Sequence, residues 1–167
     1  MKIFKDNNIH LIDIQNRLLA QQILNVQQAA YTVESKLIQF DQIPYLRESL
    51  AELQSSKEAF IAYLDNKQLI AVLSYELISP QHIDICRLVV SPKHFGKGIA
   101  TQLLNYLEFQ TKKTTKITVS TAKKNIPAIQ LYQNLGYVIN NSFWTEDKQL
   151  ELVEFAKTIE EKTKNQI

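Results

Sequence analysis

A strand, a glycine turn and a helix follow one another in the middle of the chain, and this succession constrains the fold more than any other feature. Residues 83–90 form an apolar, β-rich run that a Ser-Pro pair ends. Gly96 and Gly98 then precede residues 99–107, where apolar residues recur at the spacing of one buried helix face. Glycines let the backbone approach a ligand closely, and the helix end adds a positive potential. The sequence therefore predicts a cradle for a phosphate or pyrophosphate.

Glycine is otherwise scarce in this chain. The 167 residues include only three glycines, where average usage would give about 12. Two lie in the turn, and the third, Gly136, lies near the end of a second informative stretch at residues 125–137. Asn125 is typical of a helix N-cap, Pro127 suits the first helical turn, and Gly136 suits the residue that ends a helix. These residues predict a short helix.

Together the two stretches resemble the GNAT superfamily of acyl-CoA-dependent N-acyltransferases. Its second signature, Asn-x-x-Ala-x-x-Leu-Tyr-x-x-x-Gly-Phe/Tyr, matches residues 125–137 at every defined position. Its pyrophosphate-binding signature, Arg/Gln-x-x-Gly-x-Gly/Ala, departs at Phe95, which stands where the family usually has Arg or Gln. P-loops and dinucleotide-binding fingerprints require other glycine spacings. A purely structural turn is the remaining alternative.

The resemblance implies an α/β (α+β) fold, with a single GNAT-like domain. We expect a mixed, mostly antiparallel sheet of six to seven strands, splayed at strands 4 and 5 and flanked by about four helices. The domain would cover residues 1–159, and the polar residues 160–167 would form a frayed tail.

The remaining elements follow from hydrophobic periodicity and turn signals. A long helix with an apolar stripe from Leu19 to Leu37 follows the first strand, and the break at Pro44 precedes a second helix beginning near Leu46. A long loop would hold Phe143 and Trp144. The expected strands are residues 9–14, 59–64, 69–75, 83–90, 116–120, 137–139 and 150–155, with the fourth and fifth parallel.

The resemblance implies acetyl-CoA as the co-substrate. Backbone N–H groups of residues 96–101, with Lys97 or Lys93 as screened cations, would hold its pyrophosphate. Its pantetheine amides would pair with the strand edge at residues 88–90. The expected cofactor-binding residues are Leu88, Val89, Val90, Phe95, Gly96, Lys97, Gly98, Ile99, Ala100, Thr101, Asn125 and Tyr132.

Amine acetylation requires a base for the amine and an acid for the departing thiolate. Tyr132 occupies the position where the family places the tyrosine that faces the sulfur, and a half-buried helix tyrosine is the alternative. Asp84 is the candidate base, because strand alternation would place it on one face with Cys86 and Leu88. A water chain is the other candidate, with Glu76 and His82 as runners-up.

The acceptor amine would bind near the break between the first two helices. The candidate residues are Tyr31, Glu34, Tyr45 and Glu76, and a solvated helix-end charge is the alternative for Glu34. Cys86 is expected to be a small core residue instead of a nucleophile. The acceptor could be a small molecule or a peptide amine.

Composition limits the other function classes. A formal charge of +2 gives no support for nucleic acid or a membrane as a partner. One cysteine excludes an internal disulfide, and the three histidines have no metal-ligand spacing, so no metal is expected. No apolar run reaches the ~18 residues of a membrane span.

We therefore expect a cytoplasmic N-acetyltransferase that moves an acetyl group to a primary amine by direct attack. A homodimer is possible through sheet edges or Trp144. The competing class is a non-catalytic CoA-binding or sensing module of the same fold, which would not need Tyr132.

Overall fold

The computed structural model describes residues 8–111, 113 and 115–161. The first residues of the chain and most of the expected tail at 160–167 lie outside this range. The described residues form one seven-stranded sheet in the order β1-β2-β3-β4-β5-β7-β6. The strands are β1 (Ile9–Ile12), β2 (Ala59–Asp65), β3 (Gln68–Ser79), β4 (His82–Val90), β5 (Thr115–Ala122), β6 (Val138–Trp144) and β7 (Glu151–Ile159). The helices are α1 (Arg17–Ile38), α2 (Leu50–Gln54), α3 (Ile99–Gln110) and α4 (Ile126–Asn134), with a 3-10 turn at Pro92–His94.

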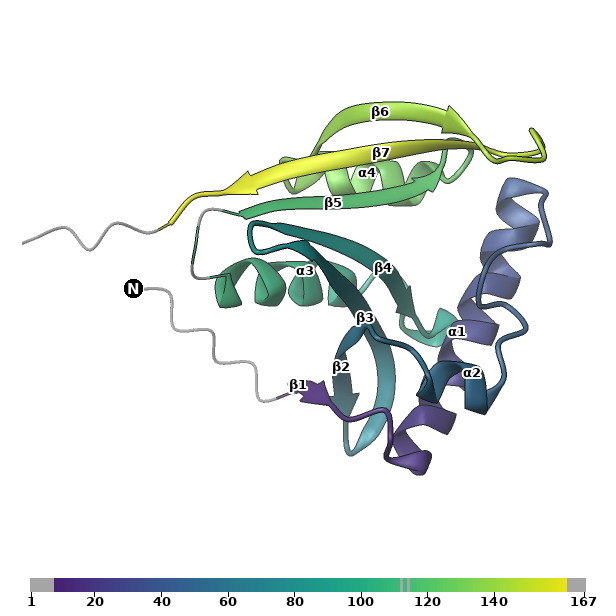
Figure 1. Ribbon diagram of the computed structural model, residues 1–167. Helices are drawn as coiled ribbons and strands as arrows, with labels where there is room; N and C mark the ends of the chain where they lie inside the picture. The colour runs from purple at the N-terminus through teal and green to yellow at the C-terminus, as the bar shows by residue number, and fades with distance from the viewer. Residues whose placement is uncertain (1–7, 112, 114, 162–167) are drawn as a thin grey trace, which may run out of the picture.

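The sheet divides between β4 and β5. These strands are parallel and pair only from His82–Lys116 to Ile85–Val119. Beyond Ile85, β4 continues to Val90 alongside β3, while β5 continues to Ala122 alongside β7. Figure 1 shows the two halves of the sheet spreading apart from this short pairing. The predicted splayed, mixed sheet is confirmed.

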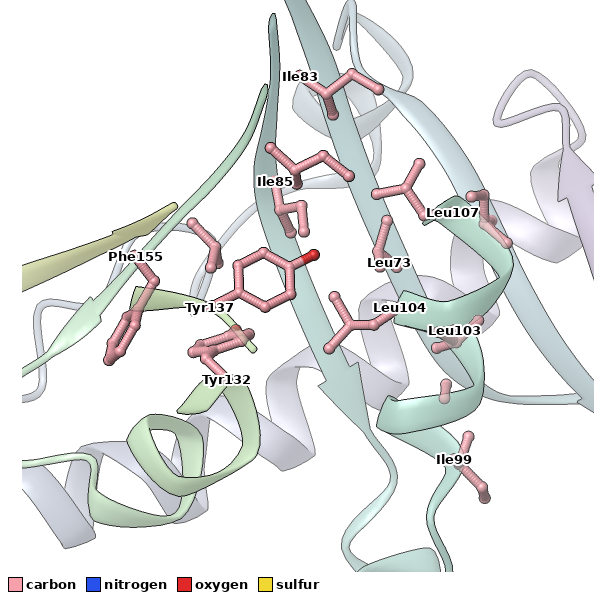
Figure 2. Close-up of a cluster of buried hydrophobic side chains, with 14 of the residues drawn as sticks. Leu73, Ile83, Ile85, Ile99, Leu103, Leu104, Leu107, Tyr132, Tyr137 and Phe155 are labelled. Carbon is pink, nitrogen blue, oxygen red and sulfur yellow. The ribbon is translucent and has the colours of Figure 1, made fainter. Parts of the chain in front are cut away.

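Helices cover both faces of the sheet and give it two cores. The apolar face of α3 packs against β2, β3 and β4 in a core that also contains residues of β5 and α4, and Leu103, Leu104 and Leu107 are buried there as predicted. Figure 2 shows the α3 leucines on one side of this core, with Tyr132, Tyr137 and Phe155 on the other. The second core joins α1 and α2 to β2 and β3 on the opposite face. The sheet therefore separates two hydrophobic cores.

Local signals set the ends of α4. The Asn125 side chain caps the helix by accepting a hydrogen bond from the Ala128 N–H at 3.3 Å. Gly136 follows the helix with a φ of +86°, a left-handed conformation that glycine adopts without strain. Both predictions for this helix are confirmed.

Two element predictions are wrong. The second helix begins at Leu50, where Ser49 forms a capping box with Glu52, and the residues near Leu46 form turns. Phe143 and Trp144 lie in β6, not in a loop. All seven β6 residues are exposed, so this edge strand lacks the alternation by which strands are recognised.

A bulge in β4 overturns the predicted facing of its side chains. Opposite β3, Arg87 pairs with Ser74 and Ile85 pairs with Tyr75, so Cys86 is one extra residue. Ile85 and Leu88 consequently pack into the same core although three positions separate them. Asp84 and Leu88 therefore do not share a face, contrary to the expectation from simple alternation.

Candidate active site

A cavity of about 620 Å³ opens where β4 and β5 separate. Its walls come from the end of β4, the glycine turn, the start of α3, and one side each of α1 and α4. All twelve expected cofactor-binding residues line it: Leu88, Val89, Val90, Phe95, Gly96, Lys97, Gly98, Ile99, Ala100, Thr101, Asn125 and Tyr132. The splayed strands therefore bring these residues around one space.

The glycine turn presents unpaired backbone N–H groups to this cavity. Gly96 and Gly98 both have a φ of +74°, and a Cβ built on either would meet no atom within 4 Å. Gly98 is the N-cap of α3, and no side chain caps this helix end. Within the described residues, no backbone N–H of residues 96–101 donates a hydrogen bond to another backbone group. The turn can accept an anionic diphosphate without displacing a protein group.

The end of β4 offers a free strand edge to the same cavity. The Ser91 N–H donates to the Ile70 oxygen of β3 at 2.8 Å. Because N–H groups alternate in direction along a strand, those of Val90 and Leu88 point away from β3 toward the gap. This edge can pair with an extended amide-bearing chain, as an added strand would.

Sequence reasoning missed part of the cavity wall. Val33 and Leu37 of α1 line the cavity and are 42% and 48% exposed, although their spacing placed them in the core stripe. His94 also lines it, and its Nδ1 atom is buried without a hydrogen-bond partner. The position of His94 directly before the glycine turn was the available signal.

A second cavity of about 220 Å³ adjoins the first. It lies between the α1–α2 connection, the bulge of β4 and the ends of β5 and β7. Three of the four expected acceptor residues, Tyr31, Glu34 and Tyr45, line it. The residues shared by the two cavities are Glu34, Leu88, Asn125, Ala128 and Tyr132. These shared residues mark the junction at which two ligands could meet.

Tyr132 is held firmly at this junction. Its side chain is 4% exposed, and its ring centroid lies 5.9 Å from that of Tyr137 and 5.5 Å from that of Phe155. Burial raises the pKa of its hydroxyl above the ordinary value, and the charge of Glu34 raises it further. The phenol is therefore protonated at neutral pH and available as a proton donor.

Glu34 contributes the carboxylate at the junction. Burial raises the pKa of Glu34, and interaction with the Asn125 side-chain amide partly opposes that rise. Cys86, in the bulge, lines the second cavity, and burial raises the pKa of its thiol to about 12. The thiol is thus protonated at neutral pH and is a poor nucleophile.

The other expected polar residues lie outside both cavities. Asp84 accepts a hydrogen bond from the Thr118 hydroxyl at 2.6 Å, and His82 Nε2 lies 2.9 Å from the same hydroxyl. Glu76 pairs opposite Asp84 on β3 and is exposed. These positions are in the closed part of the sheet, where β4 and β5 are paired. They do not support Asp84 as the base or Glu76 as an acceptor contact.

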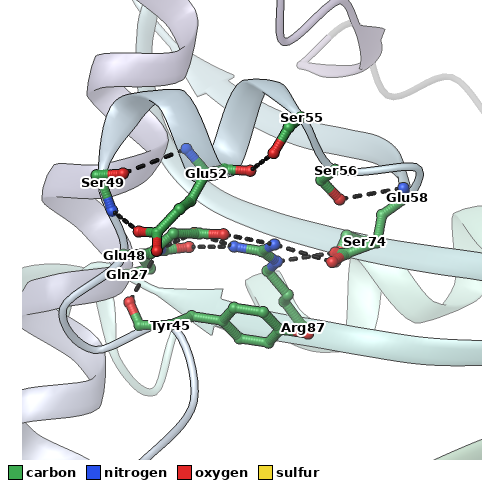
Figure 3. Close-up of polar contacts among 10 residues, drawn as sticks. All are labelled: Gln27, Tyr45, Glu48, Ser49, Glu52, Ser55, Ser56, Glu58, Ser74 and Arg87. Carbon is green, nitrogen blue, oxygen red and sulfur yellow. Dashed lines mark hydrogen bonds and ion pairs between the residues drawn. The ribbon is translucent and has the colours of Figure 1, made fainter.

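A buried ionic network lies behind the second cavity, and sequence reasoning missed it. Arg87 is 2% exposed, and its guanidinium donates hydrogen bonds to Glu48, Glu58 and Gln27 (Figure 3). Burial alone would raise the pKa of Glu58, but hydrogen bonds from Arg87 and Ser74 lower it below its usual value. The network ties the α1–α2 connection to β4.

Comparison with known proteins identifies the family. The model of the acetyltransferase (GNAT) family matches residues 20–137. The chain therefore belongs to the GNAT acetyltransferase family, and the resemblance seen in its motifs is confirmed.

One curated relative and two solved structures are similar to this chain. UPF0157 protein YqkA of Bacillus subtilis (strain 168) is 40% identical over 129 residues. That match covers 77% of this chain and 37% of YqkA, so the chain spans about a third of the relative's length. The ribosomal-protein-S18-alanine N-acetyltransferase of Escherichia coli has a TM-score of 0.72 at 15% identity, covering 95% of this chain and 97% of that chain. An aminoglycoside 6'-N-acetyltransferase complexed with coenzyme A has a TM-score of 0.71 at 18% identity, covering 92% and 98%. At these identities the two structures show a shared fold.

No helix among the described residues combines the length and the hydrophobicity that crossing a membrane requires. The described residues also include no group of three or more His, Cys, Asp or Glu side chains that could hold a metal ion.

Proposed function

We propose that this chain is an N-acetyltransferase that moves an acetyl group from acetyl-CoA to a primary amine by direct attack. The observation that carries the proposal is the cavity at the splayed strands. It joins unpaired N–H groups at the glycine turn, a free edge on β4 and the hydroxyl-bearing ring of Tyr132. That order suits a ligand with a diphosphate, two amides and a thioester.

Tyr132 is the proposed general acid. A departing thiolate has a pKa of about 8.5, whereas burial keeps the pKa of this phenol well above its ordinary value. Proton transfer therefore requires a close hydrogen bond between the phenol and the sulfur. The packing of Tyr132 against Tyr137 and Phe155 supports this role because it fixes the ring in one orientation.

Direct attack is favoured over an acyl-enzyme intermediate. Cys86 is the only cysteine of the chain, and burial raises its pKa to about 12. Within the part of the chain that the structure describes, no histidine lines the second cavity beside it to take its proton. The acceptor nitrogen is therefore the proposed nucleophile, and the chain supplies positions for the donor and acceptor on either side of the junction.

A thiol-release assay against a panel of primary amines tests the proposal. Tyr132→Phe should lower the maximal rate by about 10² to 10⁴, the usual contribution of a general acid, while acetyl-CoA affinity stays close to wild type. Tyr75→Phe is the matched control, because Tyr75 lines neither cavity. Acetyl-CoA binding without thiol release for any amine would favour the alternative, a non-catalytic CoA-binding module. Near-normal turnover of Tyr132→Phe would remove this residue from the mechanism.

A further inference from the structure

The carboxylate of Glu34 occupies a position that the reaction can use. Glu34 lies on α1 between Tyr31 and Ile38, which line the second cavity, and it also faces the first cavity. Among the described residues it forms no ion pair. Asp84, the base expected from the sequence, lies in the closed part of the sheet. Glu34 is therefore the carboxylate at the place where donor and acceptor would meet.

The Arg87 guanidinium has no donor left for a ligand. Its five N–H groups match five hydrogen bonds: Nε and Nη2 to Glu58, Nη1 and Nη2 to Glu48, and Nη1 to Gln27. Two carboxylates against one guanidinium leave this buried network with a formal charge of −1. Although Arg87 lines the second cavity, it cannot form a bidentate pair with the carboxylate of an acceptor.

The rest of the second cavity is mostly apolar or neutral. Ile38, Ile43, Pro44, Leu150 and Leu152 form much of its wall. Among the described residues that form that wall, Glu34 and Arg87 are the only charged side chains. An ammonium group suits such a site, whereas a carboxylate beside the nitrogen would meet Glu34 and a network of excess negative charge.

We infer that the second cavity takes a primary amine with a small apolar body and no carboxylate beside the nitrogen, and that Glu34 binds its ammonium group and accepts its proton. This inference rests on the proposed acetyl transfer. Glu34 takes one proton from the ammonium, and the freed lone pair forms the N–C bond to the acyl carbon while the C–S bond breaks. Tyr132 protonates the thiolate, and the second nitrogen proton returns to Tyr132.

The tyrosines that face Glu34 stay neutral, so they do not change charge when Glu34 titrates. Burial raises its pKa above the ordinary value of a glutamate, which makes it a better proton acceptor. Tyr31 and Tyr132 face it and stay neutral, because burial also raises their pKa values. The other titratable groups lining the two cavities are His94 and Lys97 in the first, and Tyr45, Cys86 and Arg87 in the second.

Three acceptors that differ at one position test the substrate class: pentylamine, norleucinamide and norleucine. Pentylamine and norleucinamide should be acetylated with a kcat/KM at least about tenfold above that of norleucine, a difference of about 1.4 kcal/mol. Equal use of norleucine would overturn the inference. So would acetyl-CoA binding by the wild type with no acetylation of pentylamine or norleucinamide.

Variants of Glu34 test the proton acceptor. Glu34→Gln should lower kcat with pentylamine by about 10² to 10⁴, remove the acidic limb of the pH–rate profile and leave the acetyl-CoA dissociation constant within about threefold. Glu34→Asp should recover part of the rate and restore the limb, and Glu146→Gln, an exposed carboxylate, is the control. An unchanged acidic limb in Glu34→Gln would overturn the inference. Calorimetry of acetyl-CoA with the wild type distinguishes failure of this inference from failure of the proposed function. Absence of binding would refute the proposed function itself.

Discussion

The guanidinium carbon of Arg87 lies 3.7 Å from the centroid of the Tyr45 ring. Tyr45 has a φ of +70°, an unusual conformation for a side chain of this size, and its carbonyl accepts a hydrogen bond from Gln27 at 3.1 Å. The stacking and the hydrogen bond hold Tyr45 in place (Figure 3). The position of Tyr45 in the wall of the second cavity therefore depends on Arg87, which is buried in β4.

Arg87→Met should destabilise the protein strongly. The substitution would leave Glu48 and Glu58 buried without their cation, and breaking a buried ion pair in this way costs about 3–5 kcal/mol. Urea denaturation followed by circular dichroism measures the change.

Lys123→Met is the control for that experiment. Lys123 pairs with Glu151 at 2.9 Å on the surface, and its side chain is 58% exposed. Exposed pairs of this kind contribute about 0–1 kcal/mol. A similar loss of stability in both variants would contradict the special role of the buried network.

Gly98→Ala should cost about 1–2 kcal/mol of stability, the penalty of a left-handed conformation for a residue with a Cβ. The cost should come from the backbone alone, since the added Cβ would meet no atom within 4 Å. Gly98→Asn should cost less, because asparagine tolerates this conformation better. Thermal unfolding of the two variants measures the difference, and equal stability of Ala and Asn would argue against backbone strain.

His94→Ala should weaken acetyl-CoA binding. His94 lines the first cavity next to Phe95, which replaces the Arg or Gln usual in the family signature. A hydrogen bond from the imidazole to the co-substrate would contribute about 0.5–1.5 kcal/mol, or roughly a two- to tenfold change in affinity. Isothermal titration calorimetry tests this, with exposed His10→Ala as the control. Equal affinity in both variants would exclude a contact by His94.

The Glu34→Gln variant should be more stable than the wild type, and this difference in stability should grow as the pH increases. Burial raises the pKa of Glu34 in the folded state, so the ionised carboxylate opposes folding once the pH exceeds its unfolded value of about 4.5. Below that pH the side chain is protonated in both states and the penalty disappears. Melting temperatures of the two proteins between pH 4 and pH 8 measure the difference. A difference in melting temperature that narrows with increasing pH would contradict a raised pKa of Glu34.

Much of the fold could be predicted because neighbouring residues determine it. Asn125 and Gly136 bound α4, and the apolar spacing of α3 shows its buried face. The unpaired turn at Gly96 and Gly98 likewise follows from local glycine chemistry. Signals of this kind lie within a few residues of the feature that they predict.

Features set by distant contacts could not be predicted in this way. The bulge at Cys86 depends on the register between β3 and β4, and it invalidated the alternation used for Asp84. The bonds of Arg87 reach residues 29, 39 and 60 positions away, so no spacing in the sequence reveals them. Val33 and Leu37 fit an apolar stripe, but periodicity does not distinguish a side chain packed on the sheet from one lining a cavity.

The binding of acetyl-CoA to the wild type and to Val90→Pro, measured by isothermal titration calorimetry, tests the central claim most directly. The Val90 N–H points into the gap and not toward β3, so proline removes a ligand contact while leaving the β3–β4 ladder intact. We expect acetyl-CoA to bind the wild type at a single site and to bind the variant with an affinity about two- to tenfold lower, while the two proteins have similar melting temperatures. Absent binding to the wild type, or the same affinity in a folded variant, would contradict it.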